Sequence, residues 1–496
     1  MPTSHEAPNH RRQVANEAGA AGEPSTLELV RAFGKVGCLG FGGPAGQAAL
    51  LQRVVVDERR WLDARGYADG LALCTVLPGP EAMQLATWTG WQVAGARGAA
   101  IAATLFVLPG AACVWLAAAT WTLWSAGAVG TGAVQGLRCA VVCLLVAALF
   151  QLARGLQVRG RALALGCVSA VLASPPISAV PVALLVGAIL GIVLLRGRVD
   201  DRGTEAGRGI ASGASSTAAP SCSARTTSRA EPVLAQGAVL PDSEPVASLR
   251  SAVAPSARTH ARPQRLPTPA SSARRPLLAG LLLLAAAWIA PLAALAAWQG
   301  GRVAEVIGLL SELALFGFGG AYTMVAWFGD SAVAQGWVAA PLVAESLGVA
   351  EATPGPLVLA LQFMSHHALA TAPGTASPLA AGTLGACVAV WSIFLPSALW
   401  VLAASRPYER VRHAPILAPM FAGVRAASLG VLLALSIQLA QATLLQGPFA
   451  ASFVDGGSVA TCVALGAWLA CRRASAPLVL AAGIALRLAL AYFAGV

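Results

Sequence analysis

Long apolar stretches alternate with short polar loops along most of this chain. The stretches run over 27–50, 68–95, 98–124, 128–152, 162–174 and 177–195, and again over 303–327, 341–370, 378–404, 416–442, 458–471 and 475–495. Runs of about 20 apolar residues are long enough to span a bilayer as helices. The pattern predicts an all-α polytopic membrane protein made of two halves, each with about six membrane segments.

The polar stretches divide the chain into five parts. A polar tail (1–24) precedes the first repeat (25–195), and a Ser-, Pro- and Arg-rich stretch (196–276) separates it from the second repeat (301–496). The tail and the linker lack a helical period, which favours disorder, and their arginines favour the cytoplasmic side. One apolar segment, 277–300, has no counterpart in the first half and is predicted to be a connecting transmembrane helix.

Two helix-breaking motifs occur once in each half. Gly-Phe-Gly-Gly at 40–43 recurs at 317–320, and Pro-Gly-Pro at 78–80 recurs at 354–356. Proline cannot continue a helix, and released backbone groups are tolerated at membrane depth only where they line a cavity or pack on protein. The motifs therefore predict broken helices around a substrate cavity, as in transporters built from repeats. Close helix packing through small residues is the alternative.

The extra segment 277–300 makes the second half enter the membrane from the opposite side. Arginines support this inversion, because loops 154–161 and 406–413 carry three arginines each, whereas their equivalents near 441–448 and 121–128 carry none. The prediction is thus a pair of inverted-topology repeats. Loop 53–65 disagrees, since it holds four arginines yet the count of segments places it outside. Either its three acids offset the bias, or the first two segments re-enter rather than span.

Composition excludes several classes of protein. Of 496 residues, 57% are hydrophobic and 11% charged, with a mean hydropathy of +0.69, whereas soluble domains carry about 25% charged residues. The net charge of +11 lies in the tail, loops and linker without interleaved aromatics, so we expect no nucleic-acid partner. Ten cysteines without a CxxC pair predict neither a disulfide framework nor a metal site. No cofactor is expected.

Charged residues inside the apolar segments are the candidates for chemistry. Lys35, Arg138 and Arg425 could bind an oxyanion, since planar guanidinium groups offer paired donors. The carboxylates expected to couple protons are Glu81, Glu312 and Glu351. A structural ion pair, for example between Lys35 and Glu312, is the alternative. The remaining substrate-binding candidates belong to the motifs or are neighbouring glutamines: Gly42, Gly43, Gln47, Pro78, Gly79, Pro80, Gln84, Gly319, Gly320, Thr353, Pro354, Gly355 and Pro356.

Taken together, these motifs resemble the chromate ion transporter family in its long, two-domain form. The residues that carry the resemblance are FGKVG at 33–37, GFGGPAGQ at 40–47, RRWL at 59–62, LPGPEAMQLAT at 77–87, FGFGGAY at 316–322, GW at 336–337 and TPGP at 353–356. The resemblance covers both halves but neither the tail nor the linker. The linker is unusually long, and residues 323–327 replace a proline-containing run that the family often shows.

The resemblance implies a multi-pass antiporter of the bacterial inner membrane that exports chromate with the proton motive force. Chromate or sulfate would be the transported anion and membrane lipid the surroundings, with a homodimer left open. A midplane site served by alternating access would follow from the broken helices. An uptake permease for sulfate or another oxyanion and an anion channel are the alternatives. No nucleophile–base pair indicates an enzyme, and no catalytic residue is assigned.

Overall fold

Helices account for nearly all of the structure, a computed structural model that describes residues 24–41, 43–156, 160–174, 177, 179–194, 274–405, 416–446, 453–471 and 474–493. The tail (1–23), Gly42 and nearly all of the linker lie outside the described residues, so the expectations for them stay predictions. The elements, in chain order, are α2 (Thr26–Leu39), α3 (Gly43–Gln52), the π-helix η1 (Arg53–Glu58), α4 (Ala64–Cys74), α5 (Glu81–Ser125), α6 (Gly127–Leu156), α7 (Arg161–Ala173), the unlabelled helix Val180–Leu194, α9 (Arg274–Gln299), α10 (Gly301–Phe316), α11 (Ala321–Ala334), α12 (Ala340–Ala352), the 3-10 helix η4 (Leu357–Leu359), α13 (Ala360–Ala370), α14 (Pro378–Ala404), α16 (Leu417–Leu444), the strands β1 (Leu445–Gln446) and β2 (Phe453–Val454), α17 (Gly456–Cys471) and α18 (Ala476–Phe493). β1 and β2 form a short antiparallel pair.

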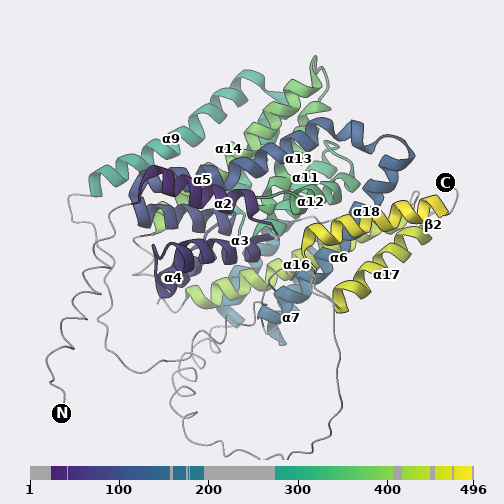
Figure 1. Cartoon of the computed structure of the whole chain (residues 1–496), viewed down its shortest axis with the longest axis horizontal. Coiled ribbons are helices and arrows are strands. Elements are labelled where there is room, and N and C mark those ends of the chain that lie inside the picture. Colours follow the sequence, from purple (N-terminus) through teal and green to yellow (C-terminus); the bar gives the residue numbers. More distant parts are fainter. Residues whose placement is uncertain are drawn as a thin grey trace, which may run out of the picture. The chain divides into compact units, whose positions relative to one another are not determined.

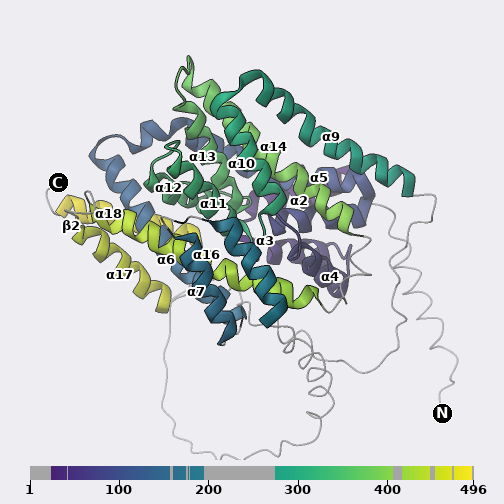
Figure 2. The ribbon, with the colours of Figure 1, turned by 180° about the vertical axis from the view of Figure 1, so that it is seen from behind.

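Five of the described helices are long and apolar enough to cross a membrane: α5, α6, α9, α14 and α16. This is fewer than the six segments per half that the apolar runs predict. Glycine and proline cut the other runs into α-helices of 10–18 residues. At 1.5 Å per residue such helices reach only about 15–27 Å, short of a hydrocarbon core about 30 Å thick. α9 is the least buried of the five and runs along one edge in both views (Figures 1 and 2).

The breaks lie where the repeated motifs predict them. α2 ends before Gly40 and α10 ends before Gly317, and these two C-caps share nearly the same backbone conformation (φ −78°, ψ 71° and φ −75°, ψ 61°). Each Pro-Gly-Pro separates two helices, α4 from α5 and α12 from η4. Gly79 and Gly355, at the centres of these motifs, have φ of +110° and +101°, which L-residues with side chains rarely adopt. The two halves therefore repeat in backbone geometry as well as in sequence.

α5 contains a further break, at the end of the apolar stretch predicted over 68–95. Ala94 and Gly95 leave the helical conformation, and Gly95 has φ +58°. The two arms fold back on each other, since a Cβ on Gly90 would meet the Gly98 carbonyl. α5 is thus a helical hairpin, equivalent to α13 followed by α14.

The breaks of one half contact the breaks of the other half. The Gly79 N–H donates to the Gly317 carbonyl (N···O 3.2 Å), and the Gly355 N–H donates to the Gly40 carbonyl (3.1 Å). The α14 residue Ser397 packs against Gly79, and its equivalent in α5, Gly110, packs against Gly355. Each Pro-Gly-Pro is therefore held by the other half, so the halves form one continuous packing unit at their centre.

The closing helices of each half also pack on the other half. α17 and α18 lie against α6, where Gly136 meets the backbone of Gly483. α7 packs against α16, and Gly423 of α16 meets the backbone at Gly187 of the helix Val180–Leu194. Small residues at these crossings allow the close backbone approach that drives helix association in membranes.

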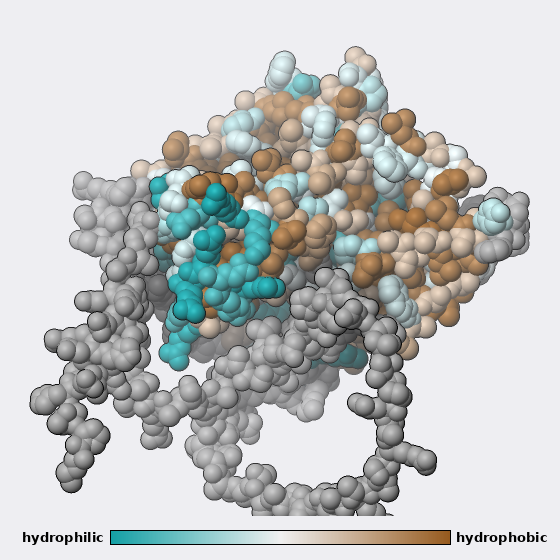
Figure 3. Space-filling model, in the orientation of Figure 1, coloured by the Kyte–Doolittle hydropathy of each residue, from teal (hydrophilic) through white to brown (hydrophobic). Residues whose placement is uncertain are grey.

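Polar and apolar surfaces are segregated. Hydrophilic side chains gather over α3, η1 and α4, where Arg53, Asp57, Arg59 and Arg60 are exposed, while apolar groups cover much of the rest of this face (Figure 3). Large apolar side chains stay exposed on many helices, including Leu283, Val463 and Leu123. Such apolar exposure suits a surface that faces lipid.

Candidate functional site

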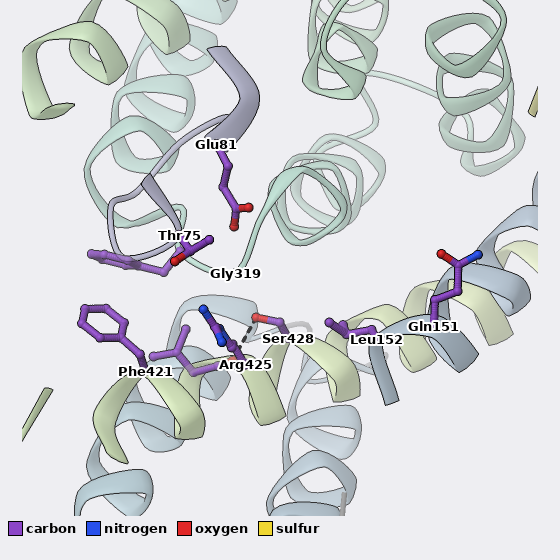
Figure 4. A pocket seen from close by; sticks show the side chains of 10 residues that line it. Thr75, Glu81, Gln151, Leu152, Gly319, Phe421, Arg425 and Ser428 are labelled. Carbon is purple, nitrogen blue, oxygen red and sulfur yellow. Dashed lines mark hydrogen bonds between the residues drawn. The ribbon is translucent and has the colours of Figure 1, made fainter. Parts of the chain in front are cut away.

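A cavity of about 330 Å³ lies where the two halves meet. It is lined by Thr75, Glu81, Gln151, Leu152, Phe318, Gly319, Phe421, Val424, Arg425 and Ser428. The lining comes from the Pro-Gly-Pro region of the first half, from Gly-Phe-Gly-Gly of the second half, and from α6 and α16. In the close view the Glu81 carboxylate and the Arg425 guanidinium approach the same space from opposite walls, with Gly319 between them (Figure 4).

Two helices begin at this cavity. Pro80 is the N-cap of α5, so Glu81 is the first residue of that helix. α11 begins at Ala321, two residues after Gly319, with Gly320 as its N-cap. Neither N-cap supplies a side-chain hydrogen bond, so free N–H groups remain in both first turns. The N-terminal ends of helices carry partial positive charge and attract anions.

α16 supplies the cation of the cavity. Arg425 and Ser428 lie one turn apart on this helix, so both can face the same space. Among the described residues, no hydrogen bond or ion pair is recorded for the Arg425 guanidinium. The Ser428 hydroxyl donates to the Val424 carbonyl (2.9 Å), and the Thr75 hydroxyl donates to the Ala72 carbonyl (2.9 Å). These hydroxyls must rotate before they can donate to a ligand.

An arginine, two helix N-termini and several rotatable hydroxyl or amide groups suit an anion rich in oxygen atoms. The guanidinium fork can donate two parallel hydrogen bonds to one oxyanion. Among the described residues no cluster of His, Cys, Asp or Glu could hold a metal ion. The cavity therefore offers the kinds of donor that an oxyanion needs, with a carboxyl group on its wall.

The two equivalent arginines have different surroundings. Arg138 Nε donates to Glu345 Oε1 (3.0 Å), a second guanidinium nitrogen binds the same oxygen, and Nη1 donates to Gln135 (3.3 Å). The Glu345 side chain is only 6% exposed. Arg138 is thus held in a largely buried ion pair and does not line the cavity.

The same difference extends to the neighbours of the arginines. Leu137 precedes Arg138 and packs against Gly348 of α12. Its equivalent, Val424, precedes Arg425 and lines the open cavity. α12 and α6 are in contact where their equivalents, α4 and α16, lie on either side of the cavity. The two halves therefore share one architecture. The crossing of α12 with α6 is closed, whereas the equivalent crossing of α4 with α16 is open.

Lys35 and Glu312 lie away from the cavity, and they do not form the ion pair with each other that the sequence offered as an alternative. The Lys35 ammonium donates to both oxygens of Glu58 (2.8 and 2.9 Å) on the surface, where it lowers the pKa of that carboxyl. Glu312 is exposed on α10. Neither residue contributes to the lining of the cavity.

Glu351 and the two glutamines contact protein groups. The Tyr322 hydroxyl donates to Glu351 Oε1 (2.8 Å), which ties α11 to α12. Gln84 donates to the Pro78 carbonyl (2.6 Å), and Gln47 donates to the carbonyls of Gly40 and Gly355. The glutamine amides therefore fasten the unwound backbone of the motifs.

The other motif residues shape the breaks rather than line the cavity. Gly43 is the first residue of α3, and Gly320 is the N-cap of α11. The Pro354–Pro356 segment lies against Gly110, and the Thr353 hydroxyl donates to the Ala350 carbonyl (3.3 Å). Of the predicted candidates, Glu81, Gly319 and Arg425 come together in the cavity wall.

Three polar lining residues escape the sequence reasoning. Thr75 occupies the position of Glu351 relative to Pro-Gly-Pro, and Ser428 follows Arg425 by one turn. Gln151 is a polar residue near the end of the apolar helix α6. Repeat position could have identified Thr75, and helical spacing could have identified Ser428, whereas only the packing of α6 brings Gln151 here.

Comparison with known proteins gives matches in both halves. The sequence matches the chromate transporter family over residues 27–192 and 304–488. A chromate transport protein of Pseudomonas aeruginosa is 26% identical over 444 residues, which cover 88% of this chain and 86% of the relative. A chromate transport protein of Cupriavidus metallidurans is 40% identical over 82 residues, 16% of this chain and 20% of the relative. A probable chromate transport protein of Synechococcus elongatus is 41% identical over 85 residues, 17% of this chain and 22% of the relative. No solved structure matches the chain.

The family match spans both repeated units and excludes the linker, as the repeated motifs do. Five long apolar helices agree with a multi-pass membrane protein, and the family consists of transporters rather than enzymes. Sequence, fold and comparison lead to the same conclusion: this chain belongs to the chromate transporter family.

Proposed function

We propose that this protein exports chromate across the bacterial inner membrane by alternating access, powered by the proton motive force, and so confers chromate resistance. The observation that carries the proposal is the cavity at the junction of the halves, which joins Arg425 to two helix N-termini. The named relatives are chromate transport proteins, and chromate is a tetrahedral dianion of the kind such donors bind.

The membrane topology we propose has α9, α6, α14, α16 and the second arm of α5 as spanning helices, while the shorter helices enter and leave on one side. Contacts between helix ends support this. Arg97, at the turn of α5, donates to the Pro24 carbonyl before α2 (3.2 Å), and Arg161 at the start of α7 donates to Leu194 (3.1 Å). At the other surface, Arg302 near the start of α10 donates to Ala368 near the end of α13 (3.2 Å).

This topology brings the three short loops that hold three or more arginines to the cytoplasm. Loops 154–161 and 406–413 stay inside, and so does loop 53–65, because α2 and α3 together re-enter instead of crossing. α9 then delivers the second half to the outer surface, which makes the two repeats inverted. If the first segments spanned the membrane, loop 53–65 with its four arginines would lie outside. Re-entrant pairs remove this conflict with the distribution of positive charge.

The open cavity lies toward the cytoplasmic side in this topology. Gln151 is close to Arg154 at the cytoplasmic end of α6, and Arg425 is in the third turn from the cytoplasmic end of α16. The equivalent crossing toward the outer side is closed by Leu137 on Gly348 and by the Arg138–Glu345 pair. We interpret this asymmetry as an inward-open state, and the outward-open state would exchange the two crossings, as inverted repeats allow.

The proposed roles follow from position. Arg425 binds the anion with the N-termini of α5 and α11, and Gly319 allows the close approach of backbone. Glu81 carries the proton. Gln47, Gln84 and the Pro-Gly-Pro motifs hold the unwound segments that must shift between states.

The test uses purified full-length protein in proteoliposomes and in inverted membrane vesicles. We expect chromate to accumulate in inverted vesicles when respiration energises them. Arg425→Ala should abolish this accumulation, whereas Arg302→Ala, which removes an arginine outside the cavity, should preserve it. If both variants still accumulated chromate, the proposed site would be refuted.

Two other functions make different predictions in the same preparation. A sulfate or general oxyanion uptake permease would fail to concentrate chromate in inverted vesicles and would prefer radiolabelled sulfate. An anion channel would let chromate follow the membrane potential at rates independent of pH. Accumulation of chromate that sulfate does not displace, at a rate that depends on pH, distinguishes the proposed exporter from both.

A further inference from the structure

The cavity wall contains one permanent cation and one carboxyl group. Arg425 supplies a fixed positive charge, whereas the carboxyl group of Glu81 can be charged or neutral. Among the described groups, Arg425 from α16 and the Cys74 thiol from α4 are the titratable groups that face Glu81. An empty cavity with an ionised Glu81 is therefore electrically balanced by Arg425.

A divalent oxyanion changes this balance. With Glu81 ionised, the anion and the carboxylate together would place three negative charges against one guanidinium. With Glu81 protonated, one negative charge is removed, and the carboxyl group can donate an O–H to an anion oxygen instead of repelling it. Anion binding therefore favours proton binding in the same cavity, and by thermodynamic linkage the proton favours the anion to the same extent.

We propose that each divalent oxyanion is carried together with one proton on Glu81, in the same direction. The inference rests on the transport function proposed above and replaces the exchange of anion for proton that the family resemblance implies. The Glu81 carboxylate takes one proton from water on the loading side, and the carboxylic acid returns that proton to water on the release side. No other bond forms or breaks.

The net charge that crosses with each chromate is then −1. An inside-negative membrane potential favours the exit of this charge, with a force that grows in proportion to the voltage. A pH gradient that is alkaline inside opposes the same step, because the proton leaves with the anion. The membrane potential is thus the component of the proton motive force that drives export.

The experiment measures chromate entry and luminal pH together in proteoliposomes loaded with an impermeant pH indicator, at a pH above the second ionisation of the oxyanion. For the wild type we expect the lumen to acidify as chromate enters, by one proton per anion, and a potassium–valinomycin potential that is positive inside to accelerate entry. The apparent affinity for chromate should rise about tenfold for each pH unit lowered, the slope for one linked proton.

Glu81→Gln isolates the carrier of the proton. We expect this variant to move chromate without luminal acidification and with a slope near zero against pH. Glu312→Gln is the matched control, because it removes an exposed carboxylate on α10 outside the cavity and should behave as the wild type.

Three outcomes would overturn the inference. The lumen of wild-type vesicles could become alkaline during chromate entry, as exchange requires, or stay unchanged in pH. Acidification could also persist in Glu81→Gln, which would assign the proton to the anion or to another residue. Failure of the wild type to move chromate at all would instead refute the transport function, and this readout precedes the measurement of coupling.

Discussion

The backbone N–H of Gly79 donates a hydrogen bond to the carbonyl of Gly317, across a sequence separation that joins the Pro-Gly-Pro of one half to the Gly-Phe-Gly-Gly of the other. Its counterpart runs from Gly355 to Gly40. Both bonds link main-chain groups, so each break in one half is completed by an unpaired group in the other half. A shift of either break therefore has to move the opposite half as well.

We expect Gly110→Ala to separate the halves at their centre. The new Cβ would meet the Pro354 carbonyl oxygen at far less than van der Waals separation, and Leu359 Cδ1 at 2.8 Å. Overpacking of this kind costs about 1–3 kcal/mol, so thermal unfolding in detergent should occur at lower temperature and transport should fall. Gly308→Ala is the control, since nothing lies within 4 Å of that position in α10. Equal behaviour of the two variants would contradict the close contact.

Substitution of the two equivalent arginines should affect different properties, the amount of folded protein in one case and transport in the other. Arg138→Ala leaves the carboxylate of Glu345 buried without a partner, which costs about 3–5 kcal/mol and should lower the amount of folded protein in the membrane. Arg425→Ala should leave the amount unchanged and abolish transport. Quantitative immunoblots and fluorescence-detected chromatography, measured beside chromate flux, separate these outcomes.

A double substitution tests the reason for the first result. Arg138→Met with Glu345→Leu replaces the ion pair by apolar side chains and should restore the folded amount, because such replacements of buried pairs are often neutral or stabilising. Recovery of the amount without transport would indicate that the pair also serves the transport cycle. No recovery would show that the loss in Arg138→Ala has another origin.

Cysteine labelling should find loop 53–65 inside. We expect Asp57→Cys to react with an impermeant maleimide only from the cytoplasmic side, and Gln335→Cys, after the equivalent pair α10 and α11, only from outside. Both positions are exposed, and a background lacking the native cysteines is required. If the first segments of each half spanned the membrane instead, Asp57→Cys would react from outside and Gln335→Cys from the cytoplasmic side. Gln157→Cys and Gln446→Cys should label from inside and outside respectively, in either arrangement.

Lys35→Met should leave transport nearly unchanged. Its ammonium is exposed and pairs with Glu58 on the surface, where screening and side-chain entropy remove most of the value of an ion pair. The measurement is chromate flux beside that of Arg425→Ala. A loss of chromate flux comparable to that of Arg425→Ala would show that Lys35 takes part in anion transport.

The breaks of the helices follow from the sequence, because glycine and proline act locally. Gly79 and Gly355 need backbone conformations that other residues avoid, and the prolines on both sides stop the helix whatever the rest of the chain does. Local rules also place the turn of α5 near Gly95. The all-helical architecture was predictable on this basis.

The site was only partly predictable, because repeat position does not determine environment. Arg138 and Arg425 are equivalent in sequence, yet Glu345 neutralises one while the other lines the cavity. Glu81 corresponds to Leu357 in the second half, so the carboxyl group of the wall has no counterpart there. Which copy stays open depends on contacts across the halves, such as Leu137 on Gly348, that no local pattern contains.

The last helices of each half pack on the other half, and this has a consequence for biosynthesis. α7 leaves the ribosome long before α16, the helix against which it packs, and α6 likewise waits for α17 and α18. The first half must therefore remain in the bilayer with small-residue surfaces uncovered until nearly the whole chain has been translated. A gene fragment that ends after the linker should yield a product that quality-control proteases remove, while the two halves produced as separate polypeptides should stabilise each other.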